Sequence, residues 1–368
     1  MKLLECRPTL HEFSDVNAFA KEFQVGTGDL VLTNRFILDA ETVFSGAQAL
    51  YQEDFGQGEP TDAMLRALLK QAGPHKRVVG IGGGTVMDLA KLMSLKVSAE
   101  DDLPALFQGK IAAEKACPCV LAPTTCGTGS EMTNVAVVLF EQMGMKLGLA
   151  SEALYASDAA LIPALMRTLP YGAFAFSSID ALIHAVESYL SPRATEITRM
   201  FSRKAIQMVL RGYKNMQPGN LPGSAVLADF LRASTYAGIA FGNAGCGAVH
   251  AMSYPIGGKY HVAHGEANYL LFPAVLRFYD ALPEKRPLEE FKRIVAGTLE
   301  CDADEALAEM EVLLGRVWRR RTLSEAGMTE SDFREFPEEV YQRQQRLLKG
   351  AMKTLSREDL EKIYDMAR

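Results

Sequence analysis

Residues 77–96 constrain the fold more than any other part of the chain. Residues 77–81 are a short apolar run that predicts a β-strand, and residues 86–96 have the apolar spacing of a helix. Between them stands Gly82-Gly83-Gly84-Thr85, where the missing side chains allow a tight turn and a close approach of the backbone to a ligand. A strand, a glycine turn and a helix in this order are typical of a unit on a parallel sheet.

The two halves of the chain differ in pattern. Further strands are predicted at 29–33, 118–122 and 134–140, with a helix at 61–72. Beyond residue 163 helical patterns dominate, at 178–189, 195–213, 225–241 and 266–279, with a Pro/Gly-rich loop at 216–223. We therefore expect an α/β, Rossmann-like nucleotide domain over 1–165 and an all-helical domain over 166–368, with the active site in the cleft between them.

A second loop of small residues strengthens the nucleotide assignment. Residues 123–131, Pro-Thr-Thr-Cys-Gly-Thr-Gly-Ser-Glu, again follow a predicted strand directly and contain no Lys or Arg. Loops at the carboxyl ends of parallel strands line one crevice, where backbone amides and hydroxyls can hold a dinucleotide. Asp88, one turn inside the helix, suits the positive helix end or accepts a hydrogen bond from the cofactor. For the glycine triplet on its own, a tight turn without a ligand stays an open alternative.

Histidine positions predict a metal site. The chain has six histidines, and four lie between residues 184 and 264: His184, His250, His261 and His264. Asp180 and His184 are four residues apart and share one helix face, on which Glu187 also lies. Gly257 and Gly258 would allow a sharp chain reversal between His250 and His264. One carboxylate and three imidazoles suit Fe²⁺ or Zn²⁺, whereas each residue alone could equally be a packed or surface polar group.

Composition and charge exclude other classes of protein. The net charge of −6 argues against a nucleic-acid partner, and no run of about 20 apolar residues could span a membrane. The first eight residues contain charges and a proline where a secretory signal needs an apolar stretch, which favours the cytoplasm. Six scattered cysteines do not form a disulfide pattern, in agreement with a reducing compartment.

Taken together, these motifs resemble the iron-containing (group III) alcohol dehydrogenases. The resemblance rests on Gly82-Gly83-Gly84-x-x-x-Asp88-x-x-Lys91, on residues 123–131, on Asp180-x-x-x-His184-x-x-Glu187, and on His250 followed by His264-Gly265. It implies a dehydroquinate synthase-like fold, and metal ligands Asp180, His184, His250 and His264. It also implies diphosphate contacts from Gly82, Gly83, Gly84 and Thr85, nicotinamide contacts from Thr124, Thr125 and Thr128, and a ribose contact from Lys146.

The chain departs from the family pattern at two positions. Many NAD-linked members carry an Asp after the second strand that binds the adenine ribose and repels a 2′-phosphate, and here Asn34 stands there. Many also carry a His four residues after the third ligand, where this chain has Tyr254. His261, three residues before the last ligand, is the expected substitute in proton transfer.

The resemblance implies an NAD-dependent, metal-dependent oxidoreductase for a small alcohol and its aldehyde. It is strongest to members that oxidise 4-hydroxybutyrate to succinate semialdehyde, and it implies a homodimer or larger homo-oligomer. Arg193, Lys259 and Arg277 are candidates to bind the substrate carboxylate. Three alternatives stay open: another small alcohol or diol, a lyase of the dehydroquinate synthase type that uses NAD and a metal, and a non-redox metal protein. The last would leave both glycine loops without a ligand.

Overall fold

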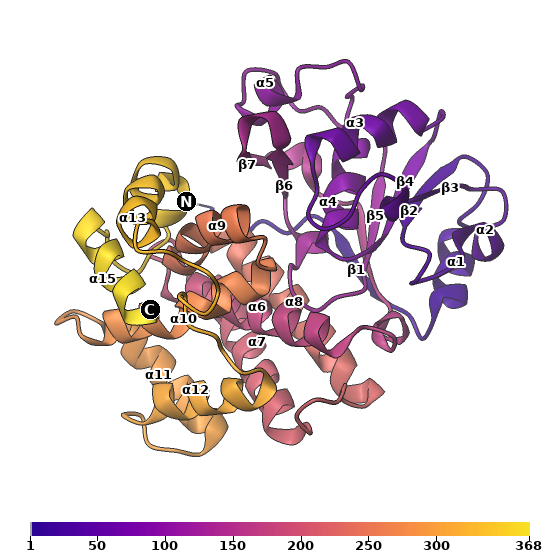
Figure 1. Ribbon diagram of the computed structural model, residues 1–368. Helices are drawn as coiled ribbons and strands as arrows, with labels where there is room; N and C mark the ends of the chain where they lie inside the picture. Colours follow the sequence, from indigo (N-terminus) through magenta and orange to yellow (C-terminus); the bar gives the residue numbers. More distant parts are fainter. Residues whose placement is uncertain (1) are drawn as a thin grey trace. The chain divides into compact units, whose positions relative to one another are not determined.

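The computed structural model describes residues 2–368 and divides into two compact units. One unit is Cys6–Leu169, and the other is Pro170–Arg368 with residues 2–5. The first carries strands and helices, and the second is helical (Figure 1). This is the fold class that the sequence predicts. The units divide at residue 169, four residues beyond the predicted boundary at 165.

A six-stranded parallel sheet forms the centre of the first unit. Its strand order is β1-β8-β5-β4-β2-β3. The strands are β1 (Thr9–Glu12), β2 (Asp29–Thr33), β3 (Gln48–Tyr51), β4 (Arg77–Gly82), β5 (Cys119–Pro123) and β8 (Asp158–Leu161). Because all six run parallel, β4 and β5, which carry the two small-residue loops, end at one edge of the sheet.

Helices cover both faces of this sheet. The helices are α1 (Val16–Phe23), α2 (Ala40–Val43), α3 (Asp62–Gln71), α4 (Gly84–Met93) and α5 (Leu103–Phe107). Alternate residues of β2 face opposite ways: Leu30 and Leu32 pack in the core that includes α3, α4 and α5, and Val31 packs in the core that includes α1 and α2. Strands buried on both faces explain the continuous apolar runs in the sequence.

The strand predicted over 134–140 is present as β6 (Val135–Phe140), and it pairs antiparallel with β7 (Met145–Ala150) outside the main sheet. One local prediction in this unit is wrong. The helix predicted to reach Lys96 ends at Met93. It ends there because the Ser94 hydroxyl donates to Lys91 O, and the next residues form a bridge in which Leu95 pairs with Lys115.

The second unit consists of packed helices. They are α6 (Tyr171–Leu190), α7 (Glu196–Asn215), α8 (Ser224–Ala244), α9 (Ala248–Tyr260), α10 (His264–Asp280), α11 (Arg286–Leu299), α12 (Ala306–Val317), α13 (Asp332–Arg343), α14 (Gln345–Leu348) and α15 (Arg357–Ala367). Helix α6 is the central element and packs against α7, α8 and α10. Within residues 2–368, no helix combines the length and apolarity needed to cross a membrane.

The chain reversal between His250 and His264 was predicted at the wrong place. Gly257 and Gly258 lie inside α9, which continues to Tyr260. The chain turns at His261, which adopts the left-handed conformation with φ 53° and ends the helix. A left-handed residue after the last helical turn is a common way to end a helix, and it is less costly for His than for a β-branched residue.

Candidate metal centre and dinucleotide loops

Helix α6 presents the first two residues of the metal cluster. Its positions from Ser178 to Leu190 are all buried, and the side chains of Asp180 and His184 lie one turn apart on it. His184 Nδ1 lies 3.7 Å from Asp180 Oδ2, and the His184 ring stacks on Phe241 at 4.2 Å. The polar pair is thus held inside an apolar helix bundle.

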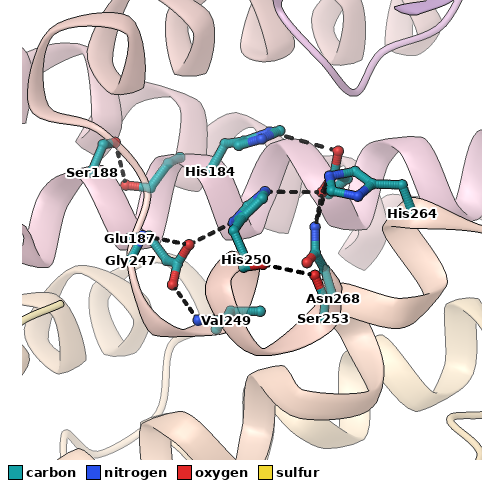
Figure 2. Close-up of polar contacts among 11 residues, drawn as sticks. His184, Glu187, Ser188, Gly247, Val249, His250, Ser253, His264 and Asn268 are labelled. Atoms are coloured by element: carbon teal, nitrogen blue, oxygen red, sulfur yellow. Dashed lines mark hydrogen bonds and ion pairs between the residues drawn. The ribbon is translucent and has the colours of Figure 1, made fainter. Parts of the chain in front are cut away.

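His250 on α9 and His264 at the start of α10 complete the cluster (Figure 2). His250 Nε2 lies 3.6 Å and His264 Nε2 3.9 Å from Asp180 Oδ1. Ligand-type atoms of all four residues lie within 4.8 Å of one another. The structure therefore brings together the four residues that the sequence suggested as ligands, from three different helices.

Glu187 hydrogen-bonds the nitrogen of His250 that faces away from the cluster. His250 Nδ1 donates to Glu187 Oε2 at 2.6 Å, and the backbone N–H groups of Gly247 and Val249 donate to the same carboxylate at 3.0 and 2.6 Å. With its proton on Nδ1, the neutral imidazole has its lone pair on Nε2, which is directed into the cluster (Figure 2). The sequence showed that Glu187 lay on the right helix face, but not that it contacts His250.

Asn268 is a residue that the sequence reasoning missed. It is buried on α10, and its Nδ2 donates to Asp180 Oδ1 at 2.7 Å and lies 3.2 Å from His264 Nε2. The signal that could have found it is its spacing of four from His264, which places both on one helix face.

Gly265 allows α10 to lie close to α6. A Cβ at this position would stand 2.3 Å from the backbone oxygen of Phe176, one turn before Asp180. Since a backbone atom cannot move aside cheaply, only glycine fits between these two helices. The position of His264 beside Asp180 thus depends on the glycine at position 265.

The donor set fits a divalent transition metal. His250 Nε2 is buried and has no hydrogen-bond partner, an arrangement that costs free energy unless a ligand completes it. The 3.6–3.9 Å separations are too long for hydrogen bonds and are comparable with those between atoms that each lie about 2.1 Å from one cation. Burial raises the pKa of Asp180, but the three imidazoles outweigh this and hold that pKa well below its usual value. The cluster therefore offers one anionic oxygen and three nitrogens.

The two expected proton-transfer residues lie at different places. The Tyr254 ring lies 6.3 Å from the His264 ring, one turn after His250 on α9. His261 is exposed at the C-terminal end of the same helix, and no contact between it and the cluster is found among the described residues.

In the first unit the two small-residue loops interlock. A Cβ on Gly83 would lie 3.5 Å from Thr125 Cγ2, and one on Gly84 would lie 2.8 Å from Thr128 Cγ2. The N–H of Thr124 donates to Gly82 O at 3.0 Å. No side chain caps the start of α4, so the N–H groups of its first turn are available to an anion.

Thr85 and Asp88 make contacts within the protein. The Thr85 hydroxyl donates to Gly58 O at 2.8 Å. Asp88 accepts from the Ser130 hydroxyl at 2.6 Å and from the Val137 N–H at 3.0 Å, and it lies 3.1 Å from Lys91 Nζ. Asp88 thus fastens the second loop and β6 to helix α4.

Asn34 and Lys146 also have partners within the protein. Asn34 is buried directly after β2, and its amide donates to Gln52 and Glu53. Lys146 on β7 forms an ion pair with Glu59. Both residues thus contact the segment that leads from β3 to α3.

Two of the three basic candidates for a substrate carboxylate already have acidic partners. Lys259 pairs with Asp332 at 2.5 Å and Arg277 with Glu311 at 2.8 Å. Arg193 packs so closely on Gly245 that a Cβ there would lie 1.9 Å from its Nη2. None of the three contacts the metal cluster in the described interactions.

Comparisons with known proteins agree on one family. A model of iron-containing alcohol dehydrogenases matches residues 11–163, and a model of the C-terminal part of the Fe-containing alcohol dehydrogenase family matches residues 174–368. The 4-hydroxybutyrate dehydrogenase of Clostridium kluyveri is 44% identical over 369 aligned residues, which cover 99% of each chain.

Solved structures show the same fold. The NADH-dependent butanol dehydrogenase A of Thermotoga maritima superposes with a TM-score of 0.82 at 22% identity, over 100% of this chain and 98% of that one. The sulfoacetaldehyde reductase of Bifidobacterium kashiwanohense, solved in complex with NAD⁺, gives a TM-score of 0.84 at 22% identity, over 98% and 97%.

Proposed function

The chain belongs to the iron-containing alcohol dehydrogenase family, and from this premise we propose that it interconverts 4-hydroxybutyrate and succinate semialdehyde with NAD(H) and a divalent iron ion. The observation that carries the metal-dependent assignment is the cluster of Asp180, His184, His250 and His264, of which the first three are buried. The substrate rests on the 44% identity over 99% of both chains. Of the three rival classes, a non-redox metal protein would leave the interlocked glycine loops without a role.

Asp180, His184, His250 and His264 would hold the cation. A divalent ion there supplies Lewis acidity, which lowers the cost of removing the proton from an alcohol. Glu187 keeps the proton of His250 on Nδ1 and leaves Nε2 for the ion. Asn268 orients the Asp180 carboxylate.

The first unit would hold the dinucleotide. N–H groups at the start of α4 and the backbone of Gly83 and Gly84 would bind the diphosphate, and Thr125 and Thr128 border the same turn. A dinucleotide bound there would supply the hydride acceptor, and these residues would fix the position of its nicotinamide. Proton exchange with solvent is assigned to Tyr254, beside His264, and to the exposed His261.

One assay tests the proposal. The protein is stripped with a chelator, reloaded anaerobically with Fe²⁺ or Zn²⁺, and mixed with NADH and succinate semialdehyde while NADH absorbance is followed. Loss of absorbance only after reloading is expected. Butyraldehyde, which has the same carbon chain without the carboxylate, measures how much the acid group matters. If NADH is not oxidised with any short aldehyde after reloading, the dehydrogenase assignment is wrong.

We also propose that the protein is a cytoplasmic homodimer or larger assembly. No disulfide joins any of the six cysteines, all of which lie within the described residues, and this agrees with a reducing compartment. Light scattering coupled to size exclusion would measure the mass, and a monomer would contradict the proposal.

A further inference from the structure

The carboxyl end of β2 lacks the acidic side chain that usually binds the ribose of an adenosine. In dinucleotide-binding folds an acidic side chain follows the strand next to the glycine-bearing strand, and accepts hydrogen bonds from the ribose hydroxyls. Here β2 is the neighbour of β4, which leads into the glycine turn, and Asn34 follows β2. A neutral amide cannot repel the 2′-phosphate of NADP(H).

The adjacent strand supplies a carboxylate to this place. Strands β2 and β3 pair in parallel with Thr33 opposite Tyr51, so both end at the same edge of the sheet. The 3₁₀ turn Gln52–Asp54 follows β3 at once, and Glu53 reaches back to β2. Its Oε2 accepts from Asn34 Nδ2 at 2.8 Å, and its Oε1 accepts from the N–H of Arg35 at 2.7 Å.

These two donors fix Glu53 without satisfying it completely. An ionised carboxylate has about four acceptor positions, and the two protein donors occupy two of them. Glu53 is only half-buried. Its remaining lone pairs are therefore available to the two hydroxyls of a ribose.

The Arg35 guanidinium could attract a 2′-phosphate, but it is paired with the carboxylate of Asp54. The guanidinium and the Asp54 carboxylate form two parallel hydrogen bonds, Nη1 to Oδ1 at 2.6 Å and Nη2 to Oδ2 at 2.7 Å, and the guanidinium lies 4.1 Å from the centre of the Tyr51 ring. This partner holds the pKa of Asp54 below its usual value. Two carboxylates, Glu53 and Asp54, and one guanidinium thus lie at this edge, and the local charge is negative.

The same segment continues to the phosphate turn. Four residues after Asp54, Gly58 O accepts a hydrogen bond from the Thr85 hydroxyl at the start of α4. The β2–β3 edge and the glycine turn are therefore connected within one unit by a short stretch of chain.

We propose that Glu53, presented by Asn34 and Arg35, binds the adenosine ribose hydroxyls and selects NAD(H) over NADP(H). This inference rests on the proposed dinucleotide function. Asp54 adds to the selection because it neutralises Arg35.

The test compares cofactor preference in a charge series at position 53. The ratio of kcat/KM with NADH to that with NADPH is measured for wild type, Glu53→Gln and Glu53→Lys, with folding checked by circular dichroism. Removing the charge should lower the ratio at least about tenfold, and reversing it should lower the ratio further. Asp54→Asn should raise NADPH use by freeing Arg35. Glu100→Gln, which removes one charge from an exposed loop of the same unit, should leave the ratio within about twofold.

A binding measurement separates this site from the rest of the reaction. Calorimetry compares 5′-AMP with adenosine 2′,5′-bisphosphate, and Glu53→Gln should favour the bisphosphate relative to wild type. If Glu53→Gln keeps the wild-type ratio in both measurements while it still oxidises NADH, the role of Glu53 is wrong. If wild type oxidises neither cofactor, the proposed function itself fails.

Discussion

The metal cluster of the helical unit depends on side chains, whereas the glycine turn of the α/β unit depends on the backbone. In the cluster, four side chains supply every ligand-type atom, and Glu187 and Asn268 orient them. At the turn the proposed binding groups are backbone N–H groups, and the absence of side chains on Gly83 and Gly84 lets two loops interlock. The cluster should therefore be sensitive to a change of functional group, and the turn to the addition of a single carbon atom.

The largest expected effect comes from the cluster carboxylate. Asp180→Asn keeps the shape of the side chain but removes the one anionic ligand, so bound metal should be lost. We expect kcat/KM to fall at least about 10³-fold, since a catalytic cation contributes several kcal/mol. Metal content by mass spectrometry and NADH binding by fluorescence distinguish the two regions. If NADH binding falls as much as metal content does, the two regions are not independent.

A smaller effect is expected from a change at Glu187, which hydrogen-bonds the proposed ligand His250. In Glu187→Gln one carboxylate oxygen becomes an N–H₂ group, which would face either the N–H of Val249 or the donors of Gly247 and His250. In either orientation the hydrogen bond from His250 is lost or loses its charged acceptor, which weakens the orientation of His250. Metal affinity, measured by competition with a chelator, should fall about 10–100-fold.

Ser253→Ala is the matched control for Glu187→Gln. The Ser253 hydroxyl donates to His250 O of the same helix, so its loss should leave metal affinity as it was. Equal affinities in Glu187→Gln and wild type would show that the hydrogen bond to His250 does not orient it.

The smallest effect is expected at the glycine turn. In Gly84→Ala the new Cβ would meet Thr128 Cγ2 at 2.8 Å, which forces the second loop to shift. Such overpacking costs about 1–3 kcal/mol, so the KM for NADH should rise roughly tenfold while metal content stays at the wild-type level. Gly84→Ala combined with Thr128→Ser removes the clashing methyl group and should restore most of the affinity. A double variant as weak as the single one would show that another contact is responsible.

Regular patterns in the sequence were sufficient to predict the architecture. The strands β2 and β4 and helix α3, with its Thr61 cap bonded to Met64 N, are found within a residue of the predicted bounds. The helical half is also confirmed, because long helices with periodic apolar residues can be predicted from the local sequence alone. The rarity of histidine indicated a metal site, and the family resemblance implied which four residues form the cluster.

Features set by tertiary packing could not be predicted. Gly257 and Gly258 suggested a chain reversal, but α9 is held helical by its packing on α10, and the turn comes at His261. Helix α4 ends early because the following residues pair with a distant segment. Apart from its spacing of four from His264, nothing in the sequence distinguishes Asn268 from other polar residues, and its role follows from its hydrogen bond to Asp180. Glu53 could not be singled out because its place beside Asn34 depends on the pairing of β3 with β2.

The contact between Gly265 and Phe176 sets more than the packing of two helices. Because α10 rests with its backbone against α6, the separation of the two helix axes determines how far His264 stands from Asp180. A cation held by the cluster would therefore have to match a separation that the backbone fixes at Gly265, a residue that supplies no ligand atom.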